Sequence, residues 1–239
     1  MPFTAADPRA LLELWERSLP LNAAAREALL AAEAGFVSST LGAQRRHLLQ
    51  ALQRHVGSMV AMRCRCPACD ATVAFDICLA DLIDALPEAD AVGEHRLDDG
   101  AWQLRFRLPA PDDLLALGDE RDDERFAASL LRRCLIDARR DGQVIEQLPP
   151  ELSARLSAQM ETLDPAASLA FDVACTDCAH VWSAPFDPAQ ALLTFLQDEA
   201  ESLLLDVDAL ARRYGWSEEQ ILALPPLRRQ AYLQFARGD

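Results

Sequence analysis

The sequence predicts a helix-rich α+β fold in which one small antiparallel sheet is flanked by helices. Leucine-rich segments with a helical spacing of apolar residues lie at both ends of the chain. Short segments that are apolar or alternate apolar with polar residues lie in the part between them. In addition, the spacing Cys-x2-Cys occurs twice, at Cys66–Cys69 and Cys175–Cys178, each time between two strand-like segments. Because cysteine pairs at this spacing are typical zinc ligands, we expect the sheet to carry a split four-cysteine zinc ribbon.

Length and charge limit the classes of protein that fit. The 239 residues are enough for one large domain or two small ones, and 51% of them are hydrophobic. The formal net charge is -15, and every basic residue except the histidines is an arginine. Such an acidic surface repels nucleic acid and anionic membranes and favours basic protein partners. We expect a cytoplasmic protein without a membrane segment, because no long apolar run and no basic leader is visible.

The first predicted region, residues 1–57, is helical. Asp7 is an N-cap residue followed by proline at the first helical position, and a leucine stripe follows it. Two further helices are expected at about 22–33 and 41–55, where leucines again repeat on one face.

The second predicted region, residues 58–110, contains most of the strands and the first Cys-x2-Cys turn. We call each such turn a knot. The expected elements, in order, are a strand at 58–63, a strand at 72–77, a short helix at 79–86 and a half-buried strand at 101–109. The third region, residues 111–167, is expected to consist of central helices at 122–140 and from 149 to about 163. Carboxylate pairs such as Asp112-Asp113 are interpreted there as caps and solvated faces.

The fourth predicted region, residues 168–239, repeats the order strand, knot, strand and helix, and is expected to form one composite domain with residues 58–110. Asp187-Pro188 should begin a long helix that reaches Tyr214, and Gly215 should end it. Ser217 and Gln220 form a predicted capping box for a short helix. A proline pair then precedes the last helix.

The two cysteine knots have similar surroundings. Five residues separate CPAC from Phe75-Asp76, and seven separate CTDC from Phe186-Asp187. Each copy has an apolar strand before the knot and a leucine-rich helix after the Phe-Asp pair. Because zinc takes four ligands in a tetrahedron, two knots supply a closed site without an open position. The predicted ligands of a structural zinc ion are Cys66, Cys69, Cys175 and Cys178.

Alternatives to this assignment exist. A Cys-x2-Cys pair also serves as a redox dithiol, and the knots could be free of metal. Cys64 could replace the first ligand of the first knot, and His180 could replace the last ligand of the second. We interpret both as strand residues or as supports of the ligands. Two further cysteines lie in apolar helical stretches and are expected in the core, namely Cys78 and Cys134.

No catalytic constellation is visible, so the chain is not expected to be an enzyme. It contains no phosphate-binding glycine loop and no nucleophile elbow, and its histidines are scattered. The segment from 209 to 235 has the outline of a DNA-binding helix-turn-helix, which makes a zinc-ribbon regulator of nucleic acid the alternative function. Nucleic-acid binding is nevertheless disfavoured, because Glu218 and Glu219 would meet the phosphates. A protein-binding surface is the preferred reading, with Trp216, Tyr232, Arg228 and Arg229 as contact residues.

The C-terminal motif resembles a known family. The order strand, C-x2-C-x-H-x-W, Phe-Asp, long helix and then LARRYGWSEEQILALPPLRRQAYL is similar to the baseplate (hub) assembly proteins of T-even-like contractile phage tails. Members also occur in phage-derived contractile injection systems of bacteria. The match is strongest from Phe171 to Phe235. Ala179 stands where the family often has a glycine, the residue that adopts left-handed backbone angles freely.

The resemblance implies a non-enzymatic assembly factor or structural component of a phage-tail-like contractile particle. Its partners would be other baseplate or hub proteins, or the tape-measure protein, and it would act through protein–protein contacts. The resemblance also implies either a cytoplasmic location or incorporation into the particle.

Overall fold

The computed structural model describes residues 7–37, 40–87, 93–118, 120 and 122–237. The chain divides into two compact units. The terminal unit consists of residues 1–21 and 190–239, and the central unit consists of residues 22–189. Over the described ranges, no helix has both the length and the apolar character that a bilayer span requires.

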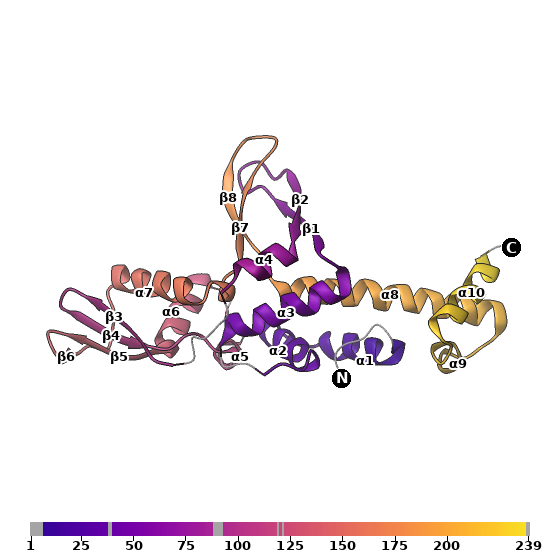
Figure 1. The fold of residues 1–239 in the computed structure, drawn as a ribbon, viewed down its shortest axis with the longest axis horizontal. Helices are drawn as coiled ribbons and strands as arrows, with labels where there is room; N and C mark the ends of the chain where they lie inside the picture. Colours follow the sequence, from indigo (N-terminus) through magenta and orange to yellow (C-terminus); the bar gives the residue numbers. More distant parts are fainter. Residues whose placement is uncertain (1–6, 38–39, 88–92, 119, 121, 238–239) are drawn as a thin grey trace. The chain divides into compact units, whose positions relative to one another are not determined.

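Figure 1 labels the elements along the chain. Those of the central unit are α2 (Ala23–Glu33), α3 (Leu41–Val56), β1 (Met59–Arg65), β2 (Thr72–Cys78), α4 (Leu79–Ala85), β3 (His95–Asp99), β4 (Trp102–Phe106), α5 (Pro111–Leu117), α6 (Asp123–Cys134), β5 (Leu135–Arg140), β6 (Gln143–Val144), α7 (Pro150–Leu163), the short 3-10 helix η1 (Pro165–Ala167), β7 (Ala170–Ala174) and β8 (Val181–Pro185). The terminal unit contains α1 (Pro8–Ser18), most of α8 (Pro188–Tyr214), α9 (Glu218–Leu222) and α10 (Pro226–Arg237). The predicted fold class is confirmed as a helix-rich α+β fold with small antiparallel sheets.

Local signals in the sequence place several helix ends correctly. Asp7 accepts hydrogen bonds from the first amides of α1, as its position before a proline predicted. Ser217 and Gln220 form the reciprocal bonds of a capping box at α9. Gly215, with a φ of 67°, ends α8. These features need only neighbouring residues, so the sequence alone was sufficient to find them.

A four-stranded antiparallel sheet with the order β3-β4-β5-β6 forms one part of the central unit. One face carries Leu104, Phe106 and Ala138, which are almost fully buried. They form one apolar cluster with three residues of α7, namely Leu152, Leu156 and Met160. This cluster is the core of the sheet; it includes Cys134 but none of the four cysteines of the Cys-x2-Cys pairs.

The predicted helix at 122–140 is wrong in its last six residues. α6 ends at Cys134, and residues 135–140 form β5, which pairs with β4 along the register Leu104↔Ala138. The segment contains apolar residues at both helical and strand spacing, so its local pattern does not decide between the two. Pairing with β4 satisfies its backbone groups in the sheet and decides the outcome. The sequence-based prediction also does not include β3, α5 or β6.

The carboxylate of Asp113 caps α5, one of the two roles expected for it, but it does not lie on a solvated face, because its side chain is only 2% exposed. It accepts hydrogen bonds from Arg107 at 2.6 and 2.8 Å and from Arg133 at 3.0 Å. The Ala110 amide, at the start of α5, donates a further bond at 2.9 Å. Asp113 thus ties α5 to the residue that follows β4 and to α6, a role that depends on partners outside its own segment.

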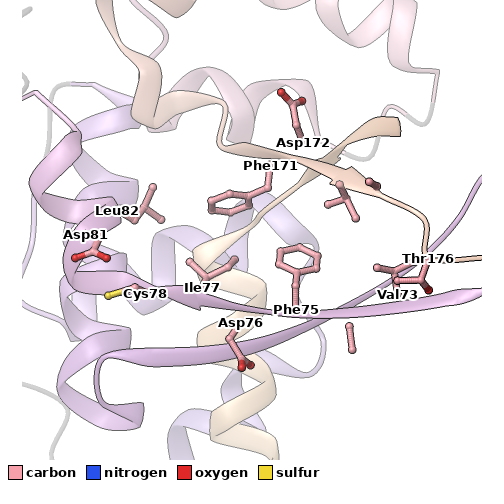
Figure 2. Close-up of a pocket in the computed structure, with 13 residues that line it drawn as sticks. Val73, Phe75, Asp76, Ile77, Cys78, Asp81, Leu82, Phe171, Asp172 and Thr176 are labelled. Atoms are coloured by element: carbon pink, nitrogen blue, oxygen red, sulfur yellow. The ribbon is translucent and has the colours of Figure 1, made fainter. Parts of the chain in front are cut away.

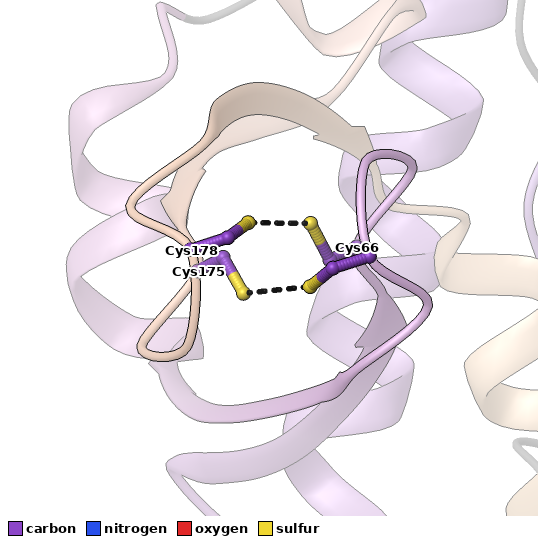
Figure 3. Close-up of side chains that lie close together, drawn as sticks. Cys66, Cys175 and Cys178 are labelled. Carbon is purple, nitrogen blue, oxygen red and sulfur yellow. Dashed lines mark hydrogen bonds between the residues drawn. The ribbon is translucent and has the colours of Figure 1, made fainter.

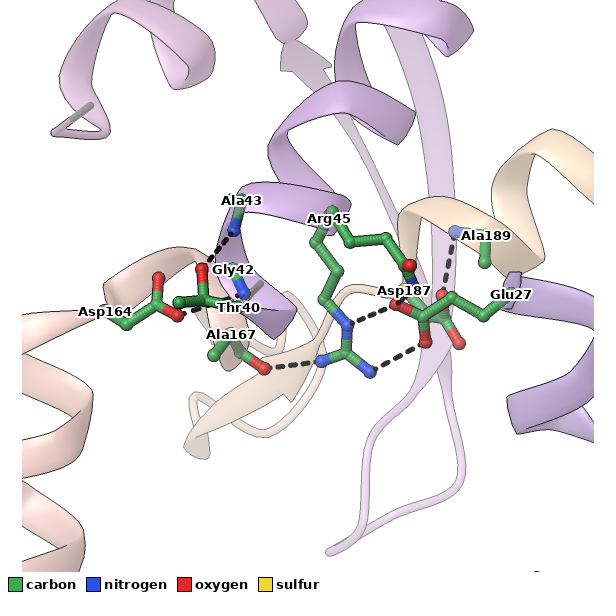
Figure 4. Close-up of polar contacts among 10 residues, drawn as sticks. Glu27, Thr40, Gly42, Ala43, Arg45, Asp164, Ala167, Asp187 and Ala189 are labelled. Carbon is green, nitrogen blue, oxygen red and sulfur yellow. Dashed lines mark hydrogen bonds and ion pairs between the residues drawn. The ribbon is translucent and has the colours of Figure 1, made fainter. Parts of the chain in front are cut away.

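Hydrogen bonds at two positions of α3, Gly42 and Arg45, anchor the helix (Figure 4). The buried carboxylate of Asp164 accepts a hydrogen bond from the Gly42 amide at 3.0 Å, at the N-terminus of the helix. Arg45 bonds Glu27 of α2 at 3.1 and 3.2 Å and donates to the carbonyl oxygen of Ala167 at 2.5 Å. Together these bonds fix α3 against α2 and against the segment that leads into β7.

Two β-hairpins carry the cysteine knots, β1-β2 and β7-β8. Each hairpin is followed by a helix, α4 or α8, so the repeat seen in the sequence is a repeat of hairpin and helix. The two Phe-Asp pairs are not equivalent, however. Asp187 precedes α8 and accepts a bond from the Ala189 amide at 2.8 Å, whereas Asp76 lies inside β2. Cys78 occupies the corresponding place before α4.

Candidate metal centre

The two Cys-x2-Cys turns face each other in the central unit, and their four sulfur atoms form one cluster (Figure 3). All four Sγ atoms lie within 4.8 Å of one another. Cys66 lies opposite Cys178 and Cys69 opposite Cys175, with 3.6 Å between the Sγ atoms of each pair. The first cysteine of each turn is therefore matched with the second cysteine of the other turn. The four predicted ligands come together as one set from two segments that are distant in the sequence.

Both turns have the same backbone hydrogen bonds. In the first, the Cys66 amide donates to the Ala71 carbonyl oxygen and the Asp70 amide donates to the Cys66 carbonyl oxygen, both at 2.9 Å. The second turn repeats these bonds at 2.9 and 3.0 Å, with Cys175, Ala179 and His180 in the corresponding places. This shared geometry directs both sulfurs of each turn to the same side, as the spacing predicted.

The hairpins pack beneath the sulfur cluster. Cys66 and Cys175 are 2% and 3% exposed, whereas the second cysteine of each turn is exposed. The buried pair forms an apolar cluster with Val73, Val173 and Ala184 from the strands. The two hairpins are thus held together by an apolar interface as well as by the cysteines above it.

The thiols have unequal acidities. Backbone hydrogen bonds from Cys178 and Asp177 lower the pKa of Cys175 to about 7. The Ala71 amide also acts to lower the pKa of Cys69, but hydrogen bonds shared with the neighbouring thiols, Cys178 foremost, raise it to about 12. Cys175 is therefore the thiol of this pair that ionises more readily, and thiols that share hydrogen bonds oppose ionisation of Cys69. A cation at the centre would offset this opposition, so the arrangement is compatible with a bound metal.

The donor set is compatible with a structural metal such as zinc. A regular tetrahedron with Zn–S bonds of about 2.3 Å has sulfur–sulfur edges of about 3.8 Å. The two measured separations of 3.6 Å are close to this edge, and the remaining sulfurs are also near neighbours. Four thiolates complete the tetrahedron and leave no position for water or a substrate. The chemistry that such a site supports is the linking of two chain segments.

The other candidate ligands lie outside the cluster of four. Cys64 is half-buried in β1, and its thiol points to the carbonyl oxygen of Val73 at 3.9 Å. His180 stacks on Trp182, with 6.1 Å between the ring centroids. Cys134 is fully buried in the core of the four-stranded sheet, as expected. Cys78 is not a helical core residue as expected, because it pairs with Met59 as the last residue of β2 and is only half-buried, before α4.

A groove of about 600 Å³ lies between the hairpins, and we call it the hairpin groove (Figure 2). It runs along β2 and β7, with the start of α4 at one end. Phe75 and Phe171 point toward each other across it, with ring centroids 6.3 Å apart. The groove is not predicted from the sequence, because β2 and β7 are far apart in the chain. The sequence feature that marks it is an aspartate within each otherwise apolar strand, at Asp76 and Asp172.

The expected partner-binding residues lie together in the terminal unit. Trp216 and Tyr232 are half-buried and stack edge to face, with ring centroids 4.9 Å apart. Both pack on a small apolar cluster formed by Leu210, Ile221 and Leu233. Arg228 is exposed on α10, whereas Arg229 is half-buried and its Nη1 atom has no hydrogen-bond partner among the described residues.

The fold and the site define a helix-rich α+β protein whose four-cysteine cluster is assembled from two separated β-hairpins. Comparison of the chain with protein-family models, curated proteins and solved structures finds no match. The family resemblance of the C-terminal motif therefore stays a prediction.

Proposed function

We propose that the four cysteines bind one structural zinc ion, and that this ion holds the β1-β2 and β7-β8 hairpins together. The observation that carries the proposal is the closed set of four sulfurs, contributed by two turns with the same backbone hydrogen bonds. Each turn alone supplies only half of a coordination shell, so the ion binds when both hairpins are in place. Metal binding and folding of the central unit are therefore coupled.

We further propose that the chain is a non-enzymatic assembly factor or structural component of a phage-tail-like contractile particle. Three features support this role. A closed thiolate site has no place for a substrate, the net charge of -15 favours basic protein surfaces, and the C-terminal motif resembles the baseplate assembly family. The partners in this proposal are baseplate, hub or tape-measure proteins, met in the cytoplasm or in the particle.

The terminal unit offers a surface for such a partner. On α10, Leu227 and Phe235 are 84% and 66% exposed, and eight positions place them on neighbouring faces of the helix. Arg228 lies beside them and is also exposed. Apolar anchors with an arginine at the rim are typical of residues that dominate binding. Trp216 and Tyr232 would support this surface from the cluster on which α10 packs.

Pull-down against the neighbouring tail, hub and tape-measure proteins tests the role. Wild-type protein should retain at least one of them, and Leu227→Asp with Phe235→Asp should lose it. Gln234→Asp, at an exposed position of the same helix, is the matched control and should keep the partner. Absence of any partner, together with intact particles from a deletion strain, would exclude the assembly role.

A gel shift at low salt separates this role from the regulatory alternative. Glu218 and Glu219 occupy the first turn of α9, and Glu219 forms an ion pair with Arg9 at 3.4 Å. An acidic helix start repels phosphate, so we expect no shift with either double-stranded or single-stranded DNA. A shift that disappears with Arg228→Ala would favour the alternative instead.

A further inference from the structure

Every second residue of β2 has backbone groups that face away from β1. The Cys66 amide bonds the Ala71 carbonyl oxygen at one end of the ladder, and the Leu79 amide bonds the Ser58 carbonyl oxygen at the other. Because bonded and non-bonded pairs alternate in an antiparallel ladder, the bonded residues within β2 are 73, 75 and 77. The outward set is Thr72, Ala74 and Asp76. No backbone hydrogen bond in the described part of the chain engages these outward groups.

The same reasoning gives β7 an open edge. The bonds Cys175 to His180 and Phe186 to Leu169 fix its ladder with β8. Its outward residues are Ala170, Asp172 and Ala174. Residues from both open edges line the hairpin groove, so the groove presents unpaired backbone groups as well as an apolar floor. An open strand edge of this kind is a template for a further strand.

The side chains around the groove set its preferred occupant. Phe75 and Phe171 form the floor, and Ile77 and Leu82 extend it toward α4. The charged residues of the lining are all acidic and exposed, namely Asp76, Asp81 and Asp172. None of these three forms an ion pair with a described residue, and no basic side chain is found among the described residues of the lining. The groove is therefore apolar within and negative at its rim.

We propose that the hairpin groove binds an extended segment of a partner protein that adds as a strand to the open edge of β2. Side chains of an added strand alternate between the two faces that β2 itself has. Those on one face would contact Phe75 and Phe171, and those on the other would lie beside Asp76. The partner segment is consequently one in which apolar residues alternate with arginine or lysine.

A second copy of the chain fits this groove poorly. The chain has a net charge of -15, and two acidic copies brought together at an acidic rim repel each other. The inference concerns a surface in the central unit and does not depend on the assembly role or on α10. Failure of the assembly proposal thus leaves the groove inference unaffected, and failure of the groove inference leaves the assembly proposal unaffected.

Fluorescence anisotropy with a synthetic peptide tests the inference on the full-length, zinc-loaded chain. The probe is a labelled peptide of seven residues, the length of β2, in which valine and arginine alternate. It should bind with a dissociation constant in the micromolar range, on the order of 1 to 100 μM. A peptide with glutamate in place of arginine should bind at least roughly tenfold more weakly. The valine–arginine peptide should lose affinity by the same factor when the alternate amides that would bond the edge of β2 are N-methylated.

Two proline variants provide a matched pair on the protein side. Ala74→Pro removes an outward amide of β2 that makes no ladder bond, so the hairpin is retained while the edge is blocked. Ala61→Pro makes the same change on the outward edge of β1, in the same hairpin. Zinc content and circular dichroism should match wild type in both. The peptide should bind Ala61→Pro normally and Ala74→Pro at least roughly tenfold more weakly.

The opposite results overturn the inference. The first is that Ala74→Pro and wild type bind the peptide equally well. The second is that wild type binds the glutamate and arginine peptides with equal affinity, and the third is that the arginine peptide does not bind below roughly 1 mM. Sedimentation equilibrium provides a separate check. A wild-type dimer that Ala74→Pro converts to monomer would show that the occupant is a second copy, which also contradicts the proposal.

Discussion

Asp70 and Ala179 occupy the same place in the two cysteine turns, one residue after the second cysteine, and share a left-handed backbone with φ of 59° and 58°. Each donates its amide hydrogen to the carbonyl oxygen of the first cysteine in its turn, at 2.9 and 3.0 Å. Left-handed angles are costly for alanine but less so for aspartate, whose side chain bonds locally. The second turn therefore holds backbone strain that the first largely avoids.

Replacing Ala179 with glycine should relieve this strain. We expect Ala179→Gly to raise the free energy of unfolding by up to about 1 kcal/mol, because the relief exceeds the entropy that glycine gains in the unfolded chain. Ala174→Gly, in the extended backbone of β7, is the control and should be destabilising. Chemical denaturation of the zinc-loaded protein measures both. A loss of stability in Ala179→Gly would contradict the account of the turn.

Removing one predicted ligand should release the metal. Cys66→Ser should lower zinc content from roughly one ion per chain to near zero and destabilise the central unit by several kcal/mol, on the order of a lost structural site. Cys64→Ser is the matched control, because Cys64 lies two residues away and outside the sulfur cluster. Native mass spectrometry and thermal unfolding provide the readouts. Full zinc occupancy and an unchanged melting temperature in Cys66→Ser would rule out the four-cysteine site.

Gly42 is required because of Asp164. A Cβ atom on Gly42 would lie 1.7 Å from Oδ1 of Asp164, a carboxylate that is only 3% exposed. Alanine normally favours a helix over glycine by about 1 kcal/mol, yet Gly42→Ala should destabilise by about 2 kcal/mol because it displaces the buried carboxylate.

The background Asp164→Ala reverses the expected sign. With the carboxylate removed, the same Gly42→Ala change should be neutral or stabilising by up to about 1 kcal/mol. Urea denaturation of the four proteins in this cycle provides the test. Equal effects of Gly42→Ala in the two backgrounds would show that the close approach carries no energetic weight.

Asp113 should make stability depend on pH in the acid range. Burial acts to raise the pKa of its carboxyl, but hydrogen bonds from Arg107, the Ala110 amide and Arg133 outweigh it and lower the pKa to about 2, from an ordinary 3.8. The contribution to stability is therefore present above pH 3.8 and lost as the pH falls toward 2. Solvent reaches the two arginines, so we expect about 1 to 2 kcal/mol.

Substitution isolates this contribution. Asp113→Asn should lower stability at pH 7 and flatten its fall between pH 4 and pH 2, roughly the interval spanned by the two pKa values. Asp112→Asn removes the adjacent, exposed carboxylate and should leave the pH profile unchanged. Denaturation at a series of pH values compares the two variants, and parallel profiles for them would exclude Asp113 as the source.

Features that depend on neighbouring residues could be predicted from the sequence. Asp7 and Ser217 cap their helices because a side-chain oxygen reaches amides two or three residues ahead. The two Cys-x2-Cys pairs indicated one site because each pair fixes the position of two sulfurs and zinc requires four. Helix-rich character followed from the leucine spacing in the same way. Each of these signals lies within a few residues of the structure it specifies.

The tertiary structure alone decided the features that join distant segments. Residues 135–140 form a strand because β4 offers backbone partners, although their own pattern is also compatible with a helix. Asp113 is buried because arginines from elsewhere in the chain offset the cost of removing its charge from water, and the buried Asp164 meets a helix amide 122 positions away in the sequence. Likewise, the hairpin groove exists only where β2 and β7 meet. The sequence determined which residues could bind a metal, whereas the packing of non-adjacent strands decided what surface surrounds it.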